Sequence, residues 1–371
     1  MRAVIIGDST HNTLSVVRSL GEAKIPQLLL LICSQDVCFV KRSKYLKHDN
    51  CYTILTLDEC LPLLDKISKE GVQQTLITTF DAAAEWVDNR EPQLSQWFRT
   101  PCRGKRLGNL FNKAEQCQLA KKCGFDVPCS IVFHRTNSLP ETIIPYPIIL
   151  KPLVSTRGTK GDIHICNCNE DFKKALAENS KCDYFLLQEF IEKDFEVDAI
   201  GVVTDDNVIM GGGVRKYRHW PKVTGAGAFG LFNKMDAYKI NTDCIKTFLD
   251  ISGYHGPFSI ELLHAKNGKY YFMEVNFRNE GLAYVSTCAG ANLHALYMDS
   301  SKGINWKRFK KTYMMNYSID YLYVKDGSIS IWRWIKDLCK TRCFINVSFS
   351  DPQPVITHYI EKLKSKFGCA C

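Results

Sequence analysis

The sequence predicts a mixed fold, in which a parallel α/β unit at the N-terminus is followed by an α+β region with an antiparallel hairpin. Residues 1–31 read as an apolar strand, a polar turn, a helix and a second apolar strand, an order typical of a parallel sheet. Residues 258–281 hold two aromatic and aliphatic runs on either side of Asn267-Gly268, which favours a hairpin. The 371 residues suffice for two or three packed units.

The composition is that of a globular chain, with 45% hydrophobic and 23% charged residues. The 17 cysteines are scattered without a CxxC pair, and their spacing is poor for zinc. Met1 leads directly into a strand pattern, without a basic segment and a long apolar run that would form a secretory signal. We therefore expect a reduced, cytoplasmic protein.

The N-terminal unit carries its polar residues at the ends of predicted strands. GDSTHN, at residues 7–12, is not a GxGxxG dinucleotide fingerprint, but it lies where ligands collect in open α/β sheets. A helix over 58–71, a strand over 75–80 and a helix from Asp81 follow. Because Asp81 comes directly after a strand, it either touches a substrate or caps its helix.

Two lysines occupy positions that favour an anionic ligand. Residues 112–124 have the period of an amphipathic helix, with Asn112 as its cap and Gly124 as its stop. Lys113 lies in the first turn, where a cation opposes the helix dipole by a few tenths of a kcal/mol, although a solvated surface lysine is the alternative. Lys151 interrupts the apolar strand 146–152 and needs an anion or a carboxylate there.

The loop after Lys151 offers hydroxyls and glycines that can wrap phosphate oxygens, among them Ser155, Thr156 and Gly158. It lacks the GxxxxGK[ST] pattern of a Walker A loop. A strand over 184–191 then leads into residues 192–203, where Glu196 and Asp198 share one strand face. Residues 214–230 are expected to form a basic and aromatic loop that holds Arg215, Lys216, Arg218, His219 and Lys222.

The hairpin is the most informative stretch. A two-residue turn at Asn267-Gly268 pairs Lys266 with Lys269 and sets Glu261 opposite Glu274. Opposed carboxylates repel unless a cation or a shared proton lies between them. Asn276 shares their face, and Mg²⁺ suits such oxygen ligands, with Mn²⁺ as an alternative ion. A solvated strand pair is the other interpretation, and Asn276, Arg278 and Gly281 together favour the metal site.

Across residues 1–300 the order of these features resembles the ATP-grasp ligases. The pattern of Glu261, Glu274, Asn276 and Arg278 resembles the metal- and phosphate-binding strands of biotin carboxylase, carbamoyl-phosphate synthetase and the carboxylate-amine ligases. In its general sequence pattern the chain is most similar to single-chain carboxylate-amine ligases, including D-aspartate ligase-like proteins. The resemblance implies a Rossmann-like domain at 1–108, ATP-grasp subdomains at 109–190 and 191–300, and a basic C-terminal extension at 301–371.

The resemblance also implies residue roles. The ATP phosphates would be held by Lys113 and Lys151, and covered by the loop with Ser155, Thr156 and Gly158. Adenine would contact the linker of Gln188, Glu189, Phe190 and Ile191, while Glu196 would bind the ribose. The metal ligands would be Glu261, Glu274 and Asn276. Arg278 and Lys151 would be the catalytic residues. The substrate carboxylate would be met by the basic loop and by Arg278, with Arg215, Arg218 and His219 as its candidates.

The implied activity is an ADP-forming ligase that joins a small carboxylate to an amine, such as an amino acid, through an acyl phosphate. A bicarbonate-using carboxylase or carbamoyl-phosphate synthetase-like enzyme is one alternative. A nucleotide-binding regulator without turnover is another.

The C-terminal residues 301–371 hold 13 Lys and Arg against 5 Asp and Glu, which accounts for 8 of the net charge of +9. They lack a run of about 20 apolar residues and a nucleic-acid fold signature, so neither a membrane span nor a nucleic-acid partner is expected. A solvated cap on the ligase core is the first interpretation. Peripheral contact with an anionic inner-membrane face or an envelope precursor is an alternative. A homodimer is left open.

Overall fold

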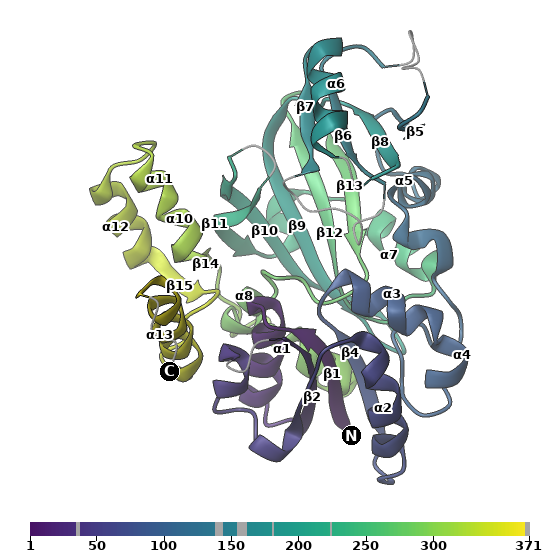
Figure 1. Ribbon diagram of the computed structural model, residues 1–371, viewed down its shortest axis with the longest axis vertical. Helices are drawn as coiled ribbons and strands as arrows, with labels where there is room; N and C mark the ends of the chain where they lie inside the picture. The colour runs from purple at the N-terminus through teal and green to yellow at the C-terminus, as the bar shows by residue number, and fades with distance from the viewer. Residues whose placement is uncertain (35–37, 138–143, 154–161, 180–181, 223–224, 368–371) are drawn as a thin grey trace.

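The computed structural model describes residues 1–34, 38–137, 144–153, 162–179, 182–222 and 225–367, and the side chains of all of these except 302 and 365–367. Within this part of the chain, three β-sheets form the framework (Figure 1). The mixed fold class predicted from the sequence is confirmed.

The N-terminal unit is built on a four-stranded sheet with the order β3-β2-β1-β4, in which every pairing is parallel, as predicted. Its strands are β1 (Arg2–Asp8), β2 (Gln27–Ile32), β3 (Cys51–Ile54) and β4 (Gln74–Thr78). Its helices are α1 (His11–Glu22), α2 (Cys60–Ser68), α3 (Asp81–Asn89) and α4 (Glu91–Leu94). The carboxyl ends of β1 and β4 therefore meet at one edge of this sheet.

A small antiparallel sheet follows, with the order β5-β8-β6-β7. Its strands are β5 (Ser130–His134), β6 (Ile148–Pro152), β7 (His164–Cys166) and β8 (Tyr184–Glu189). α6 (Asn169–Glu178) buries Phe172 and Ala175 against it. The preceding helix, α5 (Lys113–Lys122), is capped by Asn112, whose side chain accepts from the Ala114 amide, as predicted.

The large sheet has seven strands in the order β13-β12-β9-β10-β11-β14-β15. Their bounds are β9 (Lys193–Val203), β10 (Val208–Trp220), β11 (Ala226–Asn233), β12 (Gly256–Ala265), β13 (Tyr270–Asn276), β14 (Thr312–Met315) and β15 (Thr341–Phe344). α5 and α7 (Thr242–Ser252) bury apolar side chains against β12 and β13. α8 (Tyr284–Cys288) and α9 (Leu293–Met298) join this sheet to α1 in a second core.

The loop predicted over residues 214–230 is wrong, because most of this stretch forms β10 and β11, which pair with each other. Lys216, Arg218 and His219 are buried in β10. The prediction took charged side chains as a sign of solvent exposure. In β10 these side chains face carboxylates from other elements. The strand therefore buries charged residues at positions where apolar residues usually alternate.

The hairpin turn also differs from the prediction, although the predicted pairing that follows from it is present. The Ala265 amide donates to the Lys269 carbonyl at 2.9 Å, and Gly268 has φ +84°, so Lys266 to Gly268 form a three-residue loop. The register then shifts by one residue between Glu261 and Leu262. The longer loop and the bulge cancel, and Glu261 still faces Glu274 as predicted.

The C-terminal residues add β14 and β15 to the large sheet and four helices beside it (Figure 1). The helices are α10 (Tyr317–Asp320), α11 (Leu322–Lys325), α12 (Ile331–Lys340) and α13 (Gln353–Phe367). A fully buried ion pair ties this region to α1, because Arg18 Nε lies 3.0 Å from Asp351 Oδ2. No helix in the described part of the chain is long and apolar enough to cross a membrane.

Candidate active site

A cavity of about 380 Å³ lies between the small sheet and the large sheet. Part of its lining is apolar, from Ile149, Ile163, Ile165, Phe190 and Leu263. The rest is charged or polar and comes from both sheets, from α5 and from the edge of the N-terminal unit. The site can therefore take a ligand with one flat apolar part and one highly charged part.

Three carboxylates form a row across the large sheet. Asp198 on β9 is in register with Glu261 on β12, which is in register with Glu274 on β13. Glu261 and Glu274 line the cavity. Directly opposed residues share a sheet face, so the row concentrates negative charge that needs cations beside it.

Two lysines supply these cations. Lys113, at the start of α5, forms an ion pair with Glu274. Lys216 Nζ lies 2.7 Å from Asp198 Oδ1 and 3.7 Å from Glu261 Oε2. Burial opposes the charge of Lys216, but Asp198, Glu261 and Glu196 outweigh it and raise its pKa well above the usual value. Lys216 was predicted as a loop residue near substrate; it lies in β10 instead, beside these carboxylates.

Arg278 joins the hairpin to the N-terminal unit. Its Nε lies 2.8 Å from Asp81 Oδ1, and its terminal nitrogen donates to Asn276 Oδ1 at 2.9 Å. Asp81 is the first residue of α3, shortly after the end of β4 at Thr78, so it opens a helix and also holds a cavity residue.

Glu280 is a cavity residue that the sequence reasoning missed. Its Oε2 accepts from Ser259 Oγ at 3.0 Å and faces Arg278 at 3.4 Å. The signal was present, because Glu274, Asn276, Arg278 and Glu280 recur at every second position. This alternation continues past the end of β13, which places Glu280 with the other three residues.

Lys151 is buried in β6 and donates to Gln188 Oε1 on β8 at 3.0 Å. Burial lowers the pKa of Lys151 to about 8, with the like charge of Lys113 as the next cause. Gln188 Nε2 is buried and has no hydrogen-bond partner among the described residues. Gln188 is among the residues that line the cavity, and a buried donor without a partner there is consistent with a ligand that accepts from it.

Several predicted site residues lie elsewhere. Arg218 is buried between Asp320 and Asp337, at 2.7 Å from each, and does not line the cavity. Arg215 stacks on Phe195, with its guanidinium carbon 3.9 Å from the ring centre. Arg218 joins β10 to α10 and α12, and Arg215 packs on β9. Neither arginine lines the cavity, so their predicted contact with substrate finds no support in this geometry.

Other predicted residues stand at the margin of the cavity. His219 does not line it but contacts Glu196, which does, at 3.1 Å. Glu189 accepts from the Cys129 amide at 3.2 Å and does not line the cavity, whereas Gln188, Phe190 and Ile191 do. The predicted phosphate loop with Ser155, Thr156 and Gly158 lies outside the described residues.

The donor set fits a nucleotide with a divalent ion. No three His, Cys, Asp or Glu side chains of the described chain are grouped to hold a metal by themselves. Glu261, Glu274 and the amide oxygen of Asn276 would leave coordination places for phosphate and water oxygens, as Mg²⁺ prefers. The unpaired Gln188 donor and the apolar lining suit a purine base.

By its likeness to solved structures, the chain has the ATP-grasp fold. No protein-family model matches the sequence, and no curated protein matches it.

Three solved structures illustrate the likeness. N5-carboxyaminoimidazole synthetase from Staphylococcus aureus with ADP has a TM-score of 0.65 at 13% identity, covering 88% of this chain and 85% of that one. L-amino acid ligase from Bacillus licheniformis has 0.60 at 14%, covering 83% and 76%. Biotin carboxylase from Campylobacter jejuni has 0.60 at 14%, covering 83% and 74%.

Proposed function

We propose that this protein is an ATP- and Mg²⁺-dependent ligase that joins a small carboxylate to an amine through an acyl phosphate. One observation carries the proposal. Lys113, Lys151, Glu261, Glu274 and Arg278 come from four separate parts of the chain and line one cavity. Phosphoryl transfer depends mainly on positioning and charge neutralisation, for which this set of residues is suited.

The apolar and the charged parts of the cavity lining would bind different parts of ATP. The base of ATP fits against Ile149, Ile165 and Phe190, with Gln188 Nε2 as a donor. The phosphates fit between Lys113 and Lys151. A divalent ion held by Glu261, Glu274 and Asn276 would neutralise charge on the β- and γ-phosphates.

Glu196 is the candidate for the ribose hydroxyls. It lines the cavity and is oriented by Lys193 Nζ at 2.7 Å and His219 Nε2 at 3.1 Å. Although burial opposes its charge, Lys216 and His219 outweigh burial and hold the pKa of Glu196 well below its usual range. The carboxylate is therefore ionised at neutral pH and accepts hydrogen bonds from hydroxyls.

Arg278 is the candidate for the reacting groups. Asp81, Asn276 and Glu280 fix its guanidinium in place, which reduces the reorganisation needed when charge develops on a transferring phosphoryl group. Such a held guanidinium also matches the carboxylate of an acceptor or donor substrate.

A second candidate function uses bicarbonate as the carboxylate. Two of the three similar structures, N5-carboxyaminoimidazole synthetase and biotin carboxylase, are named for reactions that add a carboxyl group. Bicarbonate and a small carboxylate both offer an oxygen to the γ-phosphate, so the same lysines and metal ligands serve either reaction.

An ADP-release assay tests the proposal. Purified full chain with ATP and Mg²⁺ is tested with carboxylates and amines, singly and in pairs, and with bicarbonate. We expect rapid ADP release only when a carboxylate and an amine are both present. If bicarbonate alone stimulated ADP release, the carboxylase would replace this proposal. Tight nucleotide binding without release under any condition would indicate a regulator.

Nucleotide affinity should fall as pH rises through about 8. Below that pH the buried Lys151 is charged in the free protein, and above it the ammonium is lost before ATP binds. We expect the affinity for an ATP analogue to drop up to about tenfold per pH unit above 8. Calorimetric titration between pH 7 and 9.5 measures this.

Two variants serve as controls for the pH profile. The Lys151→Met variant should bind the analogue weakly, and its affinity should not fall near pH 8, because no group titrates at that position. Lys151→Arg should keep affinity flat to higher pH, because a guanidinium stays charged. An unchanged step in Lys151→Met would assign the titration to another group.

A further inference from the structure

The helix α12 turns an apolar face toward solvent. At about 100° per residue, Ile331, Trp332 and Ile335 fall on one side of the helix. Trp332 is 77% exposed, and Ile331 and Ile335 are 42% and 40% exposed. The helix contacts the body on another side, where Asp337 is buried. Such a face is costly in water unless something covers it.

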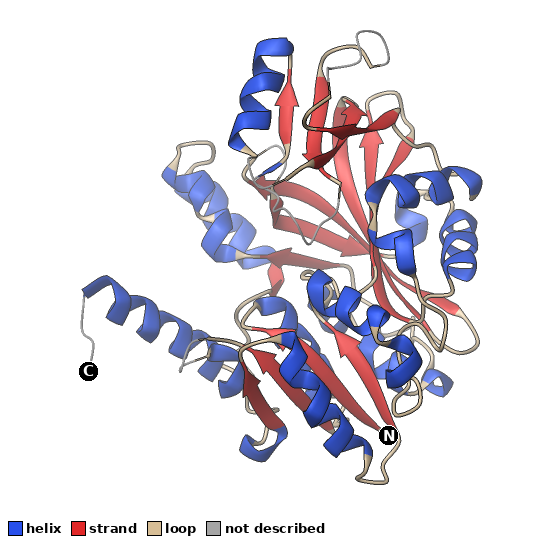
Figure 2. Cartoon of the chain, turned by 45° about the vertical axis from the view of Figure 1, so that its right-hand side comes forward, coloured by secondary structure: helices blue, strands red, loops and turns tan. Residues whose placement is uncertain are grey.

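α13 repeats this arrangement. Ile356, Tyr359, Ile360 and Leu363 follow the i, i+3, i+4, i+7 spacing of one helix face, and all four are exposed. The helix packs through His358 against Phe39 of the short 3₁₀ helix Phe39–Arg42, and Tyr359 at the edge of the apolar face contacts Tyr317 of α10. Figure 2 shows α13 extending away from the body of the molecule.

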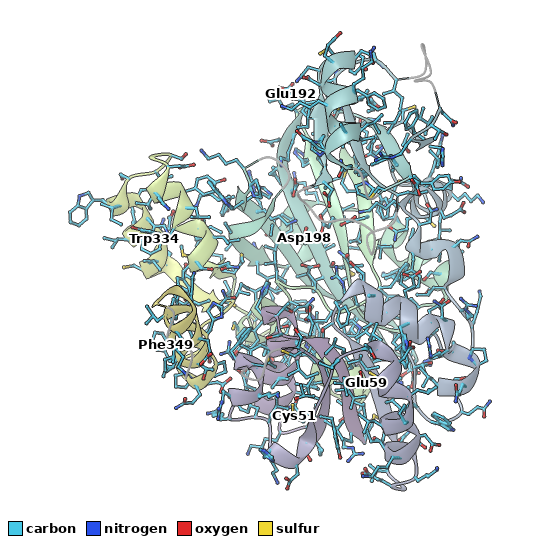
Figure 3. All side chains as sticks on the ribbon, viewed as in Figure 1. Cys51, Glu59, Glu192, Asp198, Trp334 and Phe349 are labelled. Atoms are coloured by element: carbon cyan, nitrogen blue, oxygen red, sulfur yellow. The ribbon has the colours of Figure 1, made fainter. Side chains whose placement is uncertain are left out.

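The two helices lie on the same side of the molecule, away from the small sheet (Figures 1 and 2). Phe349, which precedes α13 and is 91% exposed, lies on this side as well (Figure 3). We name the exposed apolar residues of α12 and α13, with the lysines and arginine beside them, the C-terminal face.

The charge of this face is positive. Arg333, Lys336 and Lys340 on α12 and Lys362 and Lys364 on α13 are exposed. Of the acidic residues of the region, Glu361 on α13 pairs with Lys364 at 3.3 Å, and Asp326 pairs with Lys222 at 2.7 Å. Asp320 and Asp337 are buried against Arg218, and Asp351 is buried against Arg18.

We propose that the C-terminal face binds the surface of an anionic lipid bilayer. Exposed Trp and Ile insert at the boundary between headgroups and acyl chains, while neighbouring Lys and Arg contact anionic headgroups. A second copy of this chain would bring the same positive charge to the contact. A nucleic acid would pair with the charges but would leave Ile335, Ile360 and Leu363 without apolar partners.

Vesicle co-sedimentation of the full chain tests this proposal. The vesicles are pure phosphatidylcholine or phosphatidylcholine mixed with phosphatidylglycerol. We expect binding only to the mixed vesicles, weakened by added salt. Replacing both lysines in Lys336→Gln/Lys340→Gln should lower the partition coefficient about 30-fold. Replacing the apolar pair in Trp332→Ser/Ile335→Ser should lower it about tenfold or more.

Matched controls lie on helices far from this face. Lys121→Gln/Lys122→Gln on α5 removes the same charge, and Ile251→Ser on α7 removes an isoleucine that is 53% exposed. Neither control should change the partition coefficient. Melting temperatures show that every variant is folded.

Three results would overturn the proposal. The first is equal binding to neutral and mixed vesicles, or no loss in the Trp332→Ser/Ile335→Ser variant. The second is a dimer of the wild type, seen by light scattering without vesicles, that this variant abolishes, since the face would then join two copies. The third is an RNA oligonucleotide that binds wild type and this variant equally and displaces the vesicles.

Discussion

Replacing Glu274 with Gln is expected to lower ADP release about 10³-fold while the chain stays folded. The substitution keeps the shape of the side chain and removes the charge opposite Glu261. A divalent ion would then lose one of its two carboxylate ligands, and Lys113 would lose the partner that positions it. Steady-state ADP release with the active substrate pair measures the loss, and a melting curve confirms folding.

Glu192→Gln is the matched control for this variant. Glu192 pairs with Lys266 near the hairpin loop, is exposed, and does not line the cavity (Figure 3). Its substitution should leave ADP release unchanged. If Glu274→Gln kept the activity of the Glu192→Gln control, the hairpin carboxylates would have no part in the reaction.

Replacing Lys216 with Met is expected to lower the free energy of unfolding by about 3–5 kcal/mol. Lys216 is 2% exposed and lies within 4 Å of carboxylate oxygens of Asp198, Glu196 and Glu261. Methionine fills similar space but leaves these carboxylates without their central cation. Asp198, which lies within the large sheet (Figure 3), is 1% exposed, so its charge is the one that water solvates least. Urea unfolding at pH 7 measures the difference.

Lys266→Met provides the comparison, because Lys266 also pairs with a glutamate but is 63% exposed. Its loss should change stability by less than about 1 kcal/mol. Asp198→Asn in the Lys216→Met background should recover part of the lost stability, since one unpaired charge is removed. Equal unfolding midpoints for Lys216→Met and Lys266→Met would mean that the carboxylate row does not depend on Lys216.

The parts of the fold that the sequence predicted correctly are those set by local pattern. The parallel order of the N-terminal unit follows from apolar strands that alternate with a helix. Asn112 and Gly124 mark the ends of α5 by their own chemistry. The pairing of Glu261 with Glu274 was predicted from a two-residue turn, whereas the loop has three residues. The pairing is still correct, because a bulge restores the register.

The parts that were missed depend on partners far away in the chain. Arg218 reads as a surface residue until Asp320 and Asp337, more than 100 positions later, fold against it. Asp81 and Arg278 meet across 197 positions. Local patterns carry no information on such pairs, so charged residues of β10 could not be assigned to the interior.

Anomalous diffraction from Mn²⁺ tests the central claim most directly, in crystals of the full chain grown with a non-hydrolysable ATP analogue. We predict an anomalous peak about 2.0–2.2 Å from oxygens of Glu261 and Glu274, with the analogue's phosphates between this peak and Lys151. A nucleotide bound outside this cavity, or bound within it with Mn²⁺ distant from both carboxylates, would contradict the account.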